Sequence, residues 1–199
     1  MNPTDTKEKI IYAAFDLFFN KGYKDVSLQE ISDNAGITKG GFYHYFKSKE
    51  ELFIEMMEVC YFDYMEELIN YLNNDKTDFK EKLGKIFYFY YEEFSSKMVS
   101  EKYEAGGFYI MLIDGLRRFN ELKIRLSKIY KDIEIALLNS MKKAANSGYI
   151  KKDIDYEAVI FEILSFIEGS FIVWIIMGEI DIKAKMEKEL IIIFDRISV

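Results

Sequence analysis

The chain has 199 residues, of which 50% are hydrophobic and 17% aromatic, with a formal net charge of −7. These values suit one or two folded domains with a sizeable core and exclude a disordered tail. The acidic balance also excludes DNA attraction through overall charge, so any DNA affinity has to come from locally placed lysines.

The first predicted helix follows Asp5. Asp5 and Glu8 have the spacing of a capping box, in which each residue satisfies a free backbone N–H of the other. Apolar residues then recur at helical spacing up to Phe18, and Gly22 indicates the C-terminal end. We expect this helix to pack behind the two short helices that come next.

Two short helices joined by a tight turn are predicted between residues 27 and 46. Ser27 and Glu30 form a second capping box, which starts a helix that ends near Asn34. Gly36 marks the turn, and Thr38 can cap the second helix. This is the pattern of a helix-turn-helix.

The second short helix has two chemically different faces. Phe42 and Phe46 are four residues apart and are expected to face inward. The outward face then carries side chains that can reach phosphates and glycines that let the backbone approach a duplex. The residues on this face are Lys39, Gly40, Tyr43, His44 and Lys47. The alternative is an ordinary helical hairpin with a solvated face.

The wider string favours the first interpretation. The segment AGITKGGFYHYFKSKEEL, within residues 9–53, resembles the N-terminal domain of the TetR family of bacterial transcription regulators. The resemblance covers about the first quarter of the chain. It implies an N-terminal DNA-binding domain joined to a helical domain that binds an effector and dimerises.

The resemblance also implies roles for individual residues. Ser27 and Lys49 are expected to contact phosphates. Many relatives have His at the position of Tyr45, preceded by Tyr, so it stays open which of His44 and Tyr45 reaches the phosphate. The base or phosphate contacts are expected from Thr38, Lys39, Gly40, Tyr43 and His44, with Tyr45 as the alternative to His44.

Three helices are predicted between residues 49 and 113. Ser48 and Glu51 have capping-box spacing and start a helix that runs from Lys49 to about Leu72. Asp78 and Glu81 open another, whose aromatic residues from Phe87 to Phe94 are too dense for one buried stripe. A shorter helical segment is expected at residues 108–113, with glycines at 106, 107 and 115 as breaks.

The C-terminal part predicts three long helices. Apolar spacing indicates one from about Arg117 to Ser147, stopped at Gly148. Residues 158–178 are the most hydrophobic stretch, but Glu162 and Glu168 lie inside it, and a carboxylate near a bilayer centre is unfavourable by a few kcal/mol. We therefore expect a buried helix and no membrane span. Asp181 caps the last helix.

The last two helices are expected to form a homodimer interface. A helix that is apolar all round is buried on both sides, against its own domain and against another surface. Two such helices suit a four-helix bundle with a second copy, and the resemblance implies the same. Ile175 and Phe171 are expected on this seam.

Together these elements predict an all-α fold of about nine helices. We expect a DNA-binding domain over residues 1–60, and an effector-binding and dimerisation domain over residues 61–199. The single cysteine, Cys60, excludes an internal disulfide framework, and no signal peptide is recognised, so a cytoplasmic location is expected. The only histidine is His44, and P-loop and Rossmann glycine patterns are absent, so we expect no enzyme, catalytic residue, metal or cofactor.

The predicted function is a dimeric DNA-binding transcription regulator, and more specifically a repressor of a palindromic operator. A small apolar or aromatic effector is expected to release it from DNA. The alternative is an architectural or division protein of the same fold that binds DNA without a small-molecule signal.

A ring-lined cavity is the predicted effector site, because the chain has more aromatic residues than a small helical core normally uses. Glu168 either pairs with a Lys, Arg or Tyr hydroxyl inside the protein or offers an acidic group to a cationic ligand. A fatty acyl chain would use the same apolar walls without the carboxylate. The candidate lining residues are Tyr64, Phe87, Tyr91, Phe108, Met111, Tyr130, Glu134, Phe161, Ser165 and Glu168.

Overall fold

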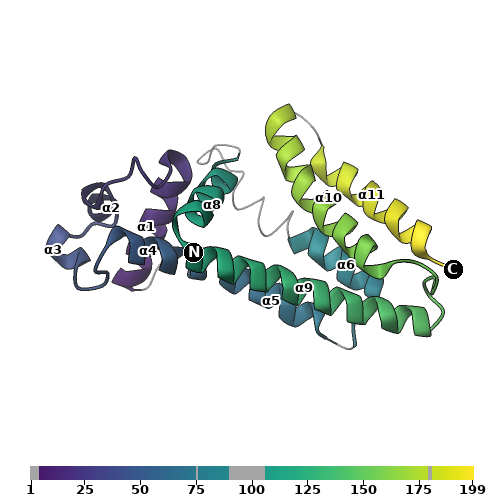
Figure 1. Cartoon of the computed structure of the whole chain (residues 1–199). Coiled ribbons are helices and arrows are strands. Elements are labelled where there is room, and N and C mark those ends of the chain that lie inside the picture. The colour runs from purple at the N-terminus through teal and green to yellow at the C-terminus, as the bar shows by residue number, and fades with distance from the viewer. Residues whose placement is uncertain (1–4, 75, 90–105, 179–180) are drawn as a thin grey trace. The chain divides into compact units, whose positions relative to one another are not determined.

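The computed structural model describes residues 5–74, 76–89, 106–178 and 181–199. Over these ranges it is helical (Figure 1), apart from loops and one isolated β-bridge between Ile150 and Ser198. Counted with α4, η1 and α5 as one continuous segment, these ranges hold nine helices, so the all-α prediction is confirmed. The elements are α1 (Thr6–Lys21), α2 (Leu28–Asn34), α3 (Lys39–Phe42), α4 (Lys49–Met57), η1 (Glu58–Phe62), α5 (Asp63–Leu72), α6 (Phe79–Tyr88), α8 (Gly107–Arg118), α9 (Asn120–Asn146), α10 (Tyr156–Met177) and α11 (Ile182–Ile197).

The chain forms two compact units. The first consists of Met1–Met65 with Val99–Leu126, and the second of Glu66–Met98 with Ser127–Val199. The division falls inside α5 and α9, so α8 groups with the N-terminal helices although it is distant from them in sequence. Each unit is described separately below.

Helix α1 forms the centre of the first unit and packs against α2, α4 and α8. Its inward residues, among them Ile10, Ala14 and Phe18, are fully buried. Asp5 is the N-cap of α1, as predicted. Its carboxylate accepts from Lys7 N at 3.3 Å, whereas the predicted capping box paired Asp5 with Glu8.

The helix predicted from residue 49 to 72 is continuous but not regular. Its start is capped by Ser48, whose hydroxyl accepts from Glu51 N at 3.0 Å, while the Glu51 carboxylate accepts from Lys47 N at 2.6 Å. Residues Glu58–Phe62 form a π-helical turn, which the sequence analysis did not predict. A π turn adds one residue to the helix. The buried positions therefore stop at Met57 before the turn and resume at Tyr61 and Phe62 at its end.

Glycines do not break α8, so the prediction of a short segment over 108–113 was wrong. Gly115 lies inside α8, where the helix packs closely on Phe53 of α4. A Cβ at this position would lie 2.8 Å from Phe53 Cε1, so the close packing favours glycine. At Gly107 a Cβ would lie 2.6 Å from the Phe19 carbonyl oxygen. The long helix predicted from Arg117 begins instead at Asn120, because Phe119 is extended, with φ −118° and ψ 101°.

In the second unit α10 and α11 lie side by side (Figure 1), and α6 packs against α11. Asp181 caps α11 as predicted, accepting from Ala184 N at 3.0 Å. Phe171 is 3% exposed and belongs to the core of the unit, so the expectation that it lies on an outer seam was wrong. Helix α10 is the one described helix that is long and apolar enough to cross a membrane, which by itself is weak evidence for a span.

Candidate nucleic-acid interface and effector groove

The start of α2 is fixed by the complete Ser27–Glu30 capping box. The Ser27 hydroxyl accepts from Glu30 N at 3.2 Å, and the Glu30 carboxylate accepts from Ser27 N at 2.7 Å and from Lys21 Nζ at 3.0 Å. These bonds, first of all the one from the Ser27 backbone, lower the pKa of Glu30 to about 2. The predicted helix start is thereby confirmed.

The turn between α2 and α3 is tight and contains Gly36, as predicted. Gly36 adopts a φ of 69°, a left-handed conformation that other residues rarely take. Ile37 N then donates to Ser32 O at 2.9 Å. Ser32 is fully buried, and its hydroxyl donates to Leu28 O at 2.8 Å, so it fits between the helices without an unsatisfied polar atom.

Helix α3 is shorter than predicted but has the predicted faces. Thr38 Oγ1 caps it by accepting from Gly41 N at 3.0 Å. Phe42 and Phe46 are buried, and their ring centroids lie 5.8 Å apart. After Phe42 the chain continues as a turn, in which Tyr45 N and Phe46 N both donate to Phe42 O.

The outward residues of this segment are exposed and close together in the chain. Tyr43 is 50% and Tyr45 39% exposed, and the Tyr43 ring packs edge-on against Phe42. Since His44 and Tyr45 are both exposed, either ring can meet a phosphate. The structure thus presents as one surface the residues Lys39, Gly40, Tyr43, His44, Tyr45 and Lys47.

Lys49 differs from the other predicted contact residues. Its ammonium group donates to Tyr23 O and Val26 O, both at 2.8 Å, and lies 4.3 Å from the Tyr23 ring centroid. Burial, and after it the nearby Arg118 charge, lowers the pKa of Lys49. In this structure Lys49 is therefore engaged within the protein. The sequence analysis missed these partners because they lie more than twenty residues upstream.

Five of the ten predicted effector residues line one groove of about 520 Å³ between α9 and α10. Four further residues line the groove and were not predicted: Ser127, Lys131, Ile160 and Leu164. The predicted residues that the groove brings together are Tyr130, Glu134, Phe161, Ser165 and Glu168.

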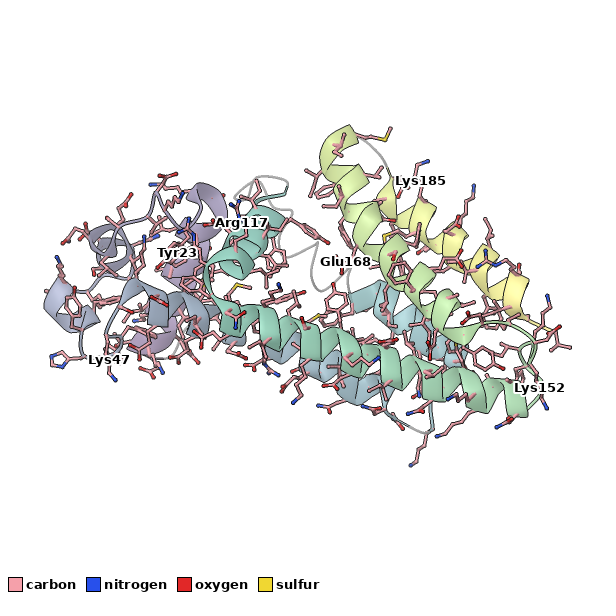
Figure 2. The ribbon with its side chains drawn as sticks, in the orientation of Figure 1. Tyr23, Lys47, Arg117, Lys152, Glu168 and Lys185 are labelled. Carbon is pink, nitrogen blue, oxygen red and sulfur yellow. The ribbon has the colours of Figure 1, made fainter. Side chains whose placement is uncertain are left out.

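The groove has polar pairs along apolar walls. The Tyr130 hydroxyl on α9 donates a hydrogen bond to Glu168, which is labelled in Figure 2. In the second pair, Lys131 Nζ lies 2.8 Å from the Glu134 carboxylate. Phe161 is 75% exposed at the edge of the groove. The groove can thus accept a ligand with an apolar body and a polar end.

The other candidates lie elsewhere. Phe87 lines a second groove of about 300 Å³ between α6 and α11. Tyr64, Phe108 and Met111 belong to the first unit, where Phe108 packs against Tyr61 with centroids 5.1 Å apart. Tyr91 lies outside the described residues. Within the second unit, the described candidates therefore line two separate grooves.

The one cysteine of the chain, Cys60, does not line either groove. Cys60 is partly exposed, and burial raises the pKa of its thiol to about 12, so less of it is thiolate at neutral pH than of an ordinary cysteine. Among the described residues, no cluster of three or more His, Cys, Asp or Glu could hold a metal ion.

Comparison with known sequences bears on the first unit. The sequence pattern described as "Bacterial regulatory proteins, tetR family" matches residues 10–56. The HTH-type transcriptional repressor NemR of Escherichia coli K12 is 30% identical over 79 residues, which cover 40% of each protein. The biofilm operon negative regulator IcaR of Staphylococcus aureus Newman is 31% identical over 86 residues, 43% of this chain and 44% of IcaR. The chain thus matches less than half the length of these relatives.

Comparison with solved structures covers nearly the whole chain. The transcriptional regulator FadR of Bacillus subtilis, solved in complex with stearoyl-CoA, matches with a TM-score of 0.71 over 96% of this chain and 98% of FadR. The two sequences are 24% identical over this match, so the likeness concerns the fold.

Proposed function

Because residues 10–56 belong to the TetR family of bacterial regulatory proteins, we propose that the chain is a cytoplasmic transcriptional repressor that binds a DNA operator. One observation carries the proposal: α3 and the turn that follows it bury Phe42 and Phe46 and leave Lys39, Tyr43 and His44 exposed. Lysine, tyrosine and histidine side chains on a helix of a helix-turn-helix can reach phosphates and base edges in the major groove. The relatives with regulatory names, NemR and IcaR, support it.

The experiment that tests this function is selection of duplexes by the purified protein from a random-sequence library. A repressor of this kind enriches a palindromic site, because two copies related by a twofold axis read two half-sites. Enrichment of a defined site, and tighter binding to that site than to a scrambled duplex, supports the proposal. Equal binding of all duplexes contradicts it.

We propose that a second copy packs against α10 and α11. The outward face of α10 exposes large apolar side chains along its length, and α11 adds Ile191 and Ile192. Large apolar side chains exposed on two neighbouring helices favour an interaction site. On α10 the residues outside the α9–α10 groove are Ile172, Val173 and Ile176.

We also propose that the groove between α9 and α10 takes the effector. Its volume suits a small molecule, and apolar walls with a few polar groups are typical of ligand sites. Since the structurally similar FadR was solved with stearoyl-CoA, fatty acyl compounds are one class to test, and lipophilic cations are the other. A ligand that binds only the folded state raises the melting temperature, so a thermal-shift screen with both classes checks the proposal. No shift with either class at any concentration up to the solubility limit counts against it.

A further inference from the structure

The π turn Glu58–Phe62 is flanked by two contacts with α8. Before the turn, Phe53 of α4 packs against Gly115, where an added Cβ would lie 2.8 Å from Phe53 Cε1. Near the end of the turn, the Tyr61 ring packs against the Phe108 ring, with centroids 5.1 Å apart. The continuous segment of α4 and η1 is therefore held by α8 at two points.

The spacing of these two contacts accounts for the extra residue. A regular α-helix turns about 100° per residue, so residues seven apart point in nearly the same direction, whereas residues eight apart differ by about 80°. On α8, Phe108 and Gly115 are seven residues apart and share a face. Their partners, Phe53 and Tyr61, are eight residues apart. Because a π turn takes up one residue, it lets both partners face α8.

Arg125 of α9 contacts the first and the last residue of the π turn. Its Nε donates to the Glu58 carboxylate at 3.2 Å, and its guanidinium carbon lies 5.7 Å from the Phe62 ring centroid. Phe62 is fully buried, and the side chains of Arg125 and Glu58 are 26% and 37% exposed. A cation–π contact is stronger when the cation is partly removed from water. Arg125 therefore stabilises the turn at both of its ends.

Helix α4 carries the register of the π turn to the helix-turn-helix. It begins at the Ser48 cap, directly after the turn that follows α3, and Leu52 and Phe53 in its first turns are fully buried. Phe53 also packs edge-on against Phe18 of α1, with ring centroids 5.1 Å apart. Loss of the extra residue would rotate Phe53 by about 100° relative to Tyr61, so one of the two would leave its contact. A rotation on the Phe53 side displaces the adjoining end of the helix-turn-helix.

We propose that the π turn fixes the rotational register of α4 for operator binding, and that Arg125 is the positioning residue that holds the turn. The inference rests on the proposed DNA-binding function. It gives a role in operator affinity to side chains outside the helix-turn-helix. Arg125 acts through Glu58 and Phe62, and the contacts with DNA are made by other residues.

The first test measures the turn itself, in the full-length protein without DNA. Arg125→Met keeps an unbranched side chain but removes the charge and the donors. Amide hydrogen exchange, followed by mass spectrometry, should become faster in peptides that cover residues 58–65, because the turn loses contacts at both ends. Arg117→Met is the matched control. Arg117, labelled in Figure 2, is an exposed arginine of α8, and its loss should leave the exchange of these peptides unchanged.

The second test measures operator affinity with the duplex that the wild-type protein selects from random sequence. Arg125→Met should weaken binding by about tenfold, as expected for loss of a hydrogen bond between charged groups. Arg125→Lys keeps a cation beside Glu58 and should recover most of the affinity. Adding Glu58→Gln to Arg125→Met should cause no further loss, because both changes break the same pair. Active concentrations are fixed by stoichiometric titration, so unfolded protein does not enter the affinities.

Deletion of Val59 tests the extra residue directly. Without it the segment from Lys49 to Leu72 can form a regular α-helix, so circular dichroism should show unchanged helix content. Phe53 and Tyr61 then cannot both face α8, and operator binding should fall at least as far as in Arg125→Met. A folded deletion variant with wild-type affinity overturns the inference. If the variant does not fold, the Arg125 variants decide.

The remaining outcomes are separable. Wild-type exchange of residues 58–65 in Arg125→Met, or wild-type affinity of that variant, overturns the inference. A slope of log affinity against log salt that is reduced by about 0.9 relative to Arg117→Met would make Arg125 a phosphate contact and overturn it as well. If the wild-type protein selects no duplex, the proposed function fails, whereas the exchange experiment still shows whether Arg125 holds the turn.

Discussion

The phenol of Tyr130 on α9 donates its hydrogen bond to Oε1 of Glu168 on α10, inside the groove between these helices. This bond satisfies a carboxylate on the most apolar helix of the chain, which is one of the two roles that the sequence left open for Glu168. The carboxylate also lines the groove, so the ligand-binding role stays a prediction. The side chains with ionisable groups that line the groove are Glu134, Glu168 and Lys131.

Substitution of Glu168 distinguishes the two effector classes. Glu168→Gln keeps an oxygen that accepts from Tyr130 but removes the charge, so calorimetry should show weaker binding of lipophilic cations, by about 1.5 to 3 kcal/mol, and unchanged binding of fatty acyl compounds. Glu162→Gln is the matched control, because Glu162 lies on the same helix, pairs with Arg196 and does not line the groove. Equal affinities of parent and mutant for both classes would make Glu168 purely structural.

The surface around α3 should determine DNA affinity. Lys39→Ala and Tyr43→Ala are each expected to weaken operator binding by about 1 to 3 kcal/mol, because both side chains are exposed on the outward face and little of the core depends on them. Fluorescence anisotropy with a labelled duplex measures the change. Lys152→Ala removes the same charge from the second unit and serves as the control. Unaltered affinity in both α3 variants would remove α3 from DNA reading.

The apolar face of α10 should be needed for dimerisation. Ile176 is 76% exposed, so Ile176→Glu should leave the fold of the monomer intact while it buries a charge in the proposed interface. Sedimentation velocity should then show monomers. The control is Phe171→Glu, which places the charge in the core of the unit and should unfold the protein. A dimer that survives Ile176→Glu and Ile172→Glu lies on another surface.

Two glycine substitutions should have opposite effects on stability. In Gly115→Ala the new methyl group meets Phe53 at 2.8 Å, so we expect a loss of about 1 to 3 kcal/mol from overpacking. Gly84 lies within α6, where a methyl group would have no neighbouring atom within 4 Å, so Gly84→Ala should gain about 0.5 to 1 kcal/mol through helix propensity. Urea denaturation measures both. Similar effects of the two changes would contradict the close packing of α8 on α4.

The capping box formed by Ser27 and Glu30 should make the free energy of unfolding depend on pH. The pKa of Glu30 is about 2 in the folded protein, below its ordinary value near 4.5. The unfolded chain therefore binds the proton first, and the stabilisation is complete above pH 4.5 and is lost as the pH falls toward 2. The melting temperatures of wild type and Glu30→Gln should differ most near pH 6 and converge near pH 2. A difference that is constant over this range would show that the charge of Glu30 does not contribute.

Much of the architecture follows from local patterns. The caps at Ser27, Thr38 and Asp78 and the inward pair Phe42 and Phe46 depend on residues within four positions of one another, and the structure confirms them. Local spacing is what a single sequence displays, so helix starts and buried faces were predictable.

The errors arose where distant segments meet. Gly115 looks like a helix break until Phe53 is known to lie against it. Lys49 was expected only to contact phosphate, because its bonds to Tyr23 and Val26 join residues that are distant in the chain. The π turn at Glu58–Phe62 has no local sequence marker of its own. The lining of the α9–α10 groove likewise depends on which faces of two helices meet, so only part of it could be predicted.

The burial of Cys60 has a practical consequence for spectroscopy. Since burial raises the pKa of its thiol to about 12, the one cysteine of this chain should react more slowly with maleimides and methanethiosulfonates at neutral pH than an exposed cysteine does. A second cysteine placed at an exposed position outside the DNA-facing surface, such as Lys9 of α1, would then be labelled first. Spin labels there would report the separation of the two helix-turn-helix units in a dimer directly, free and on DNA.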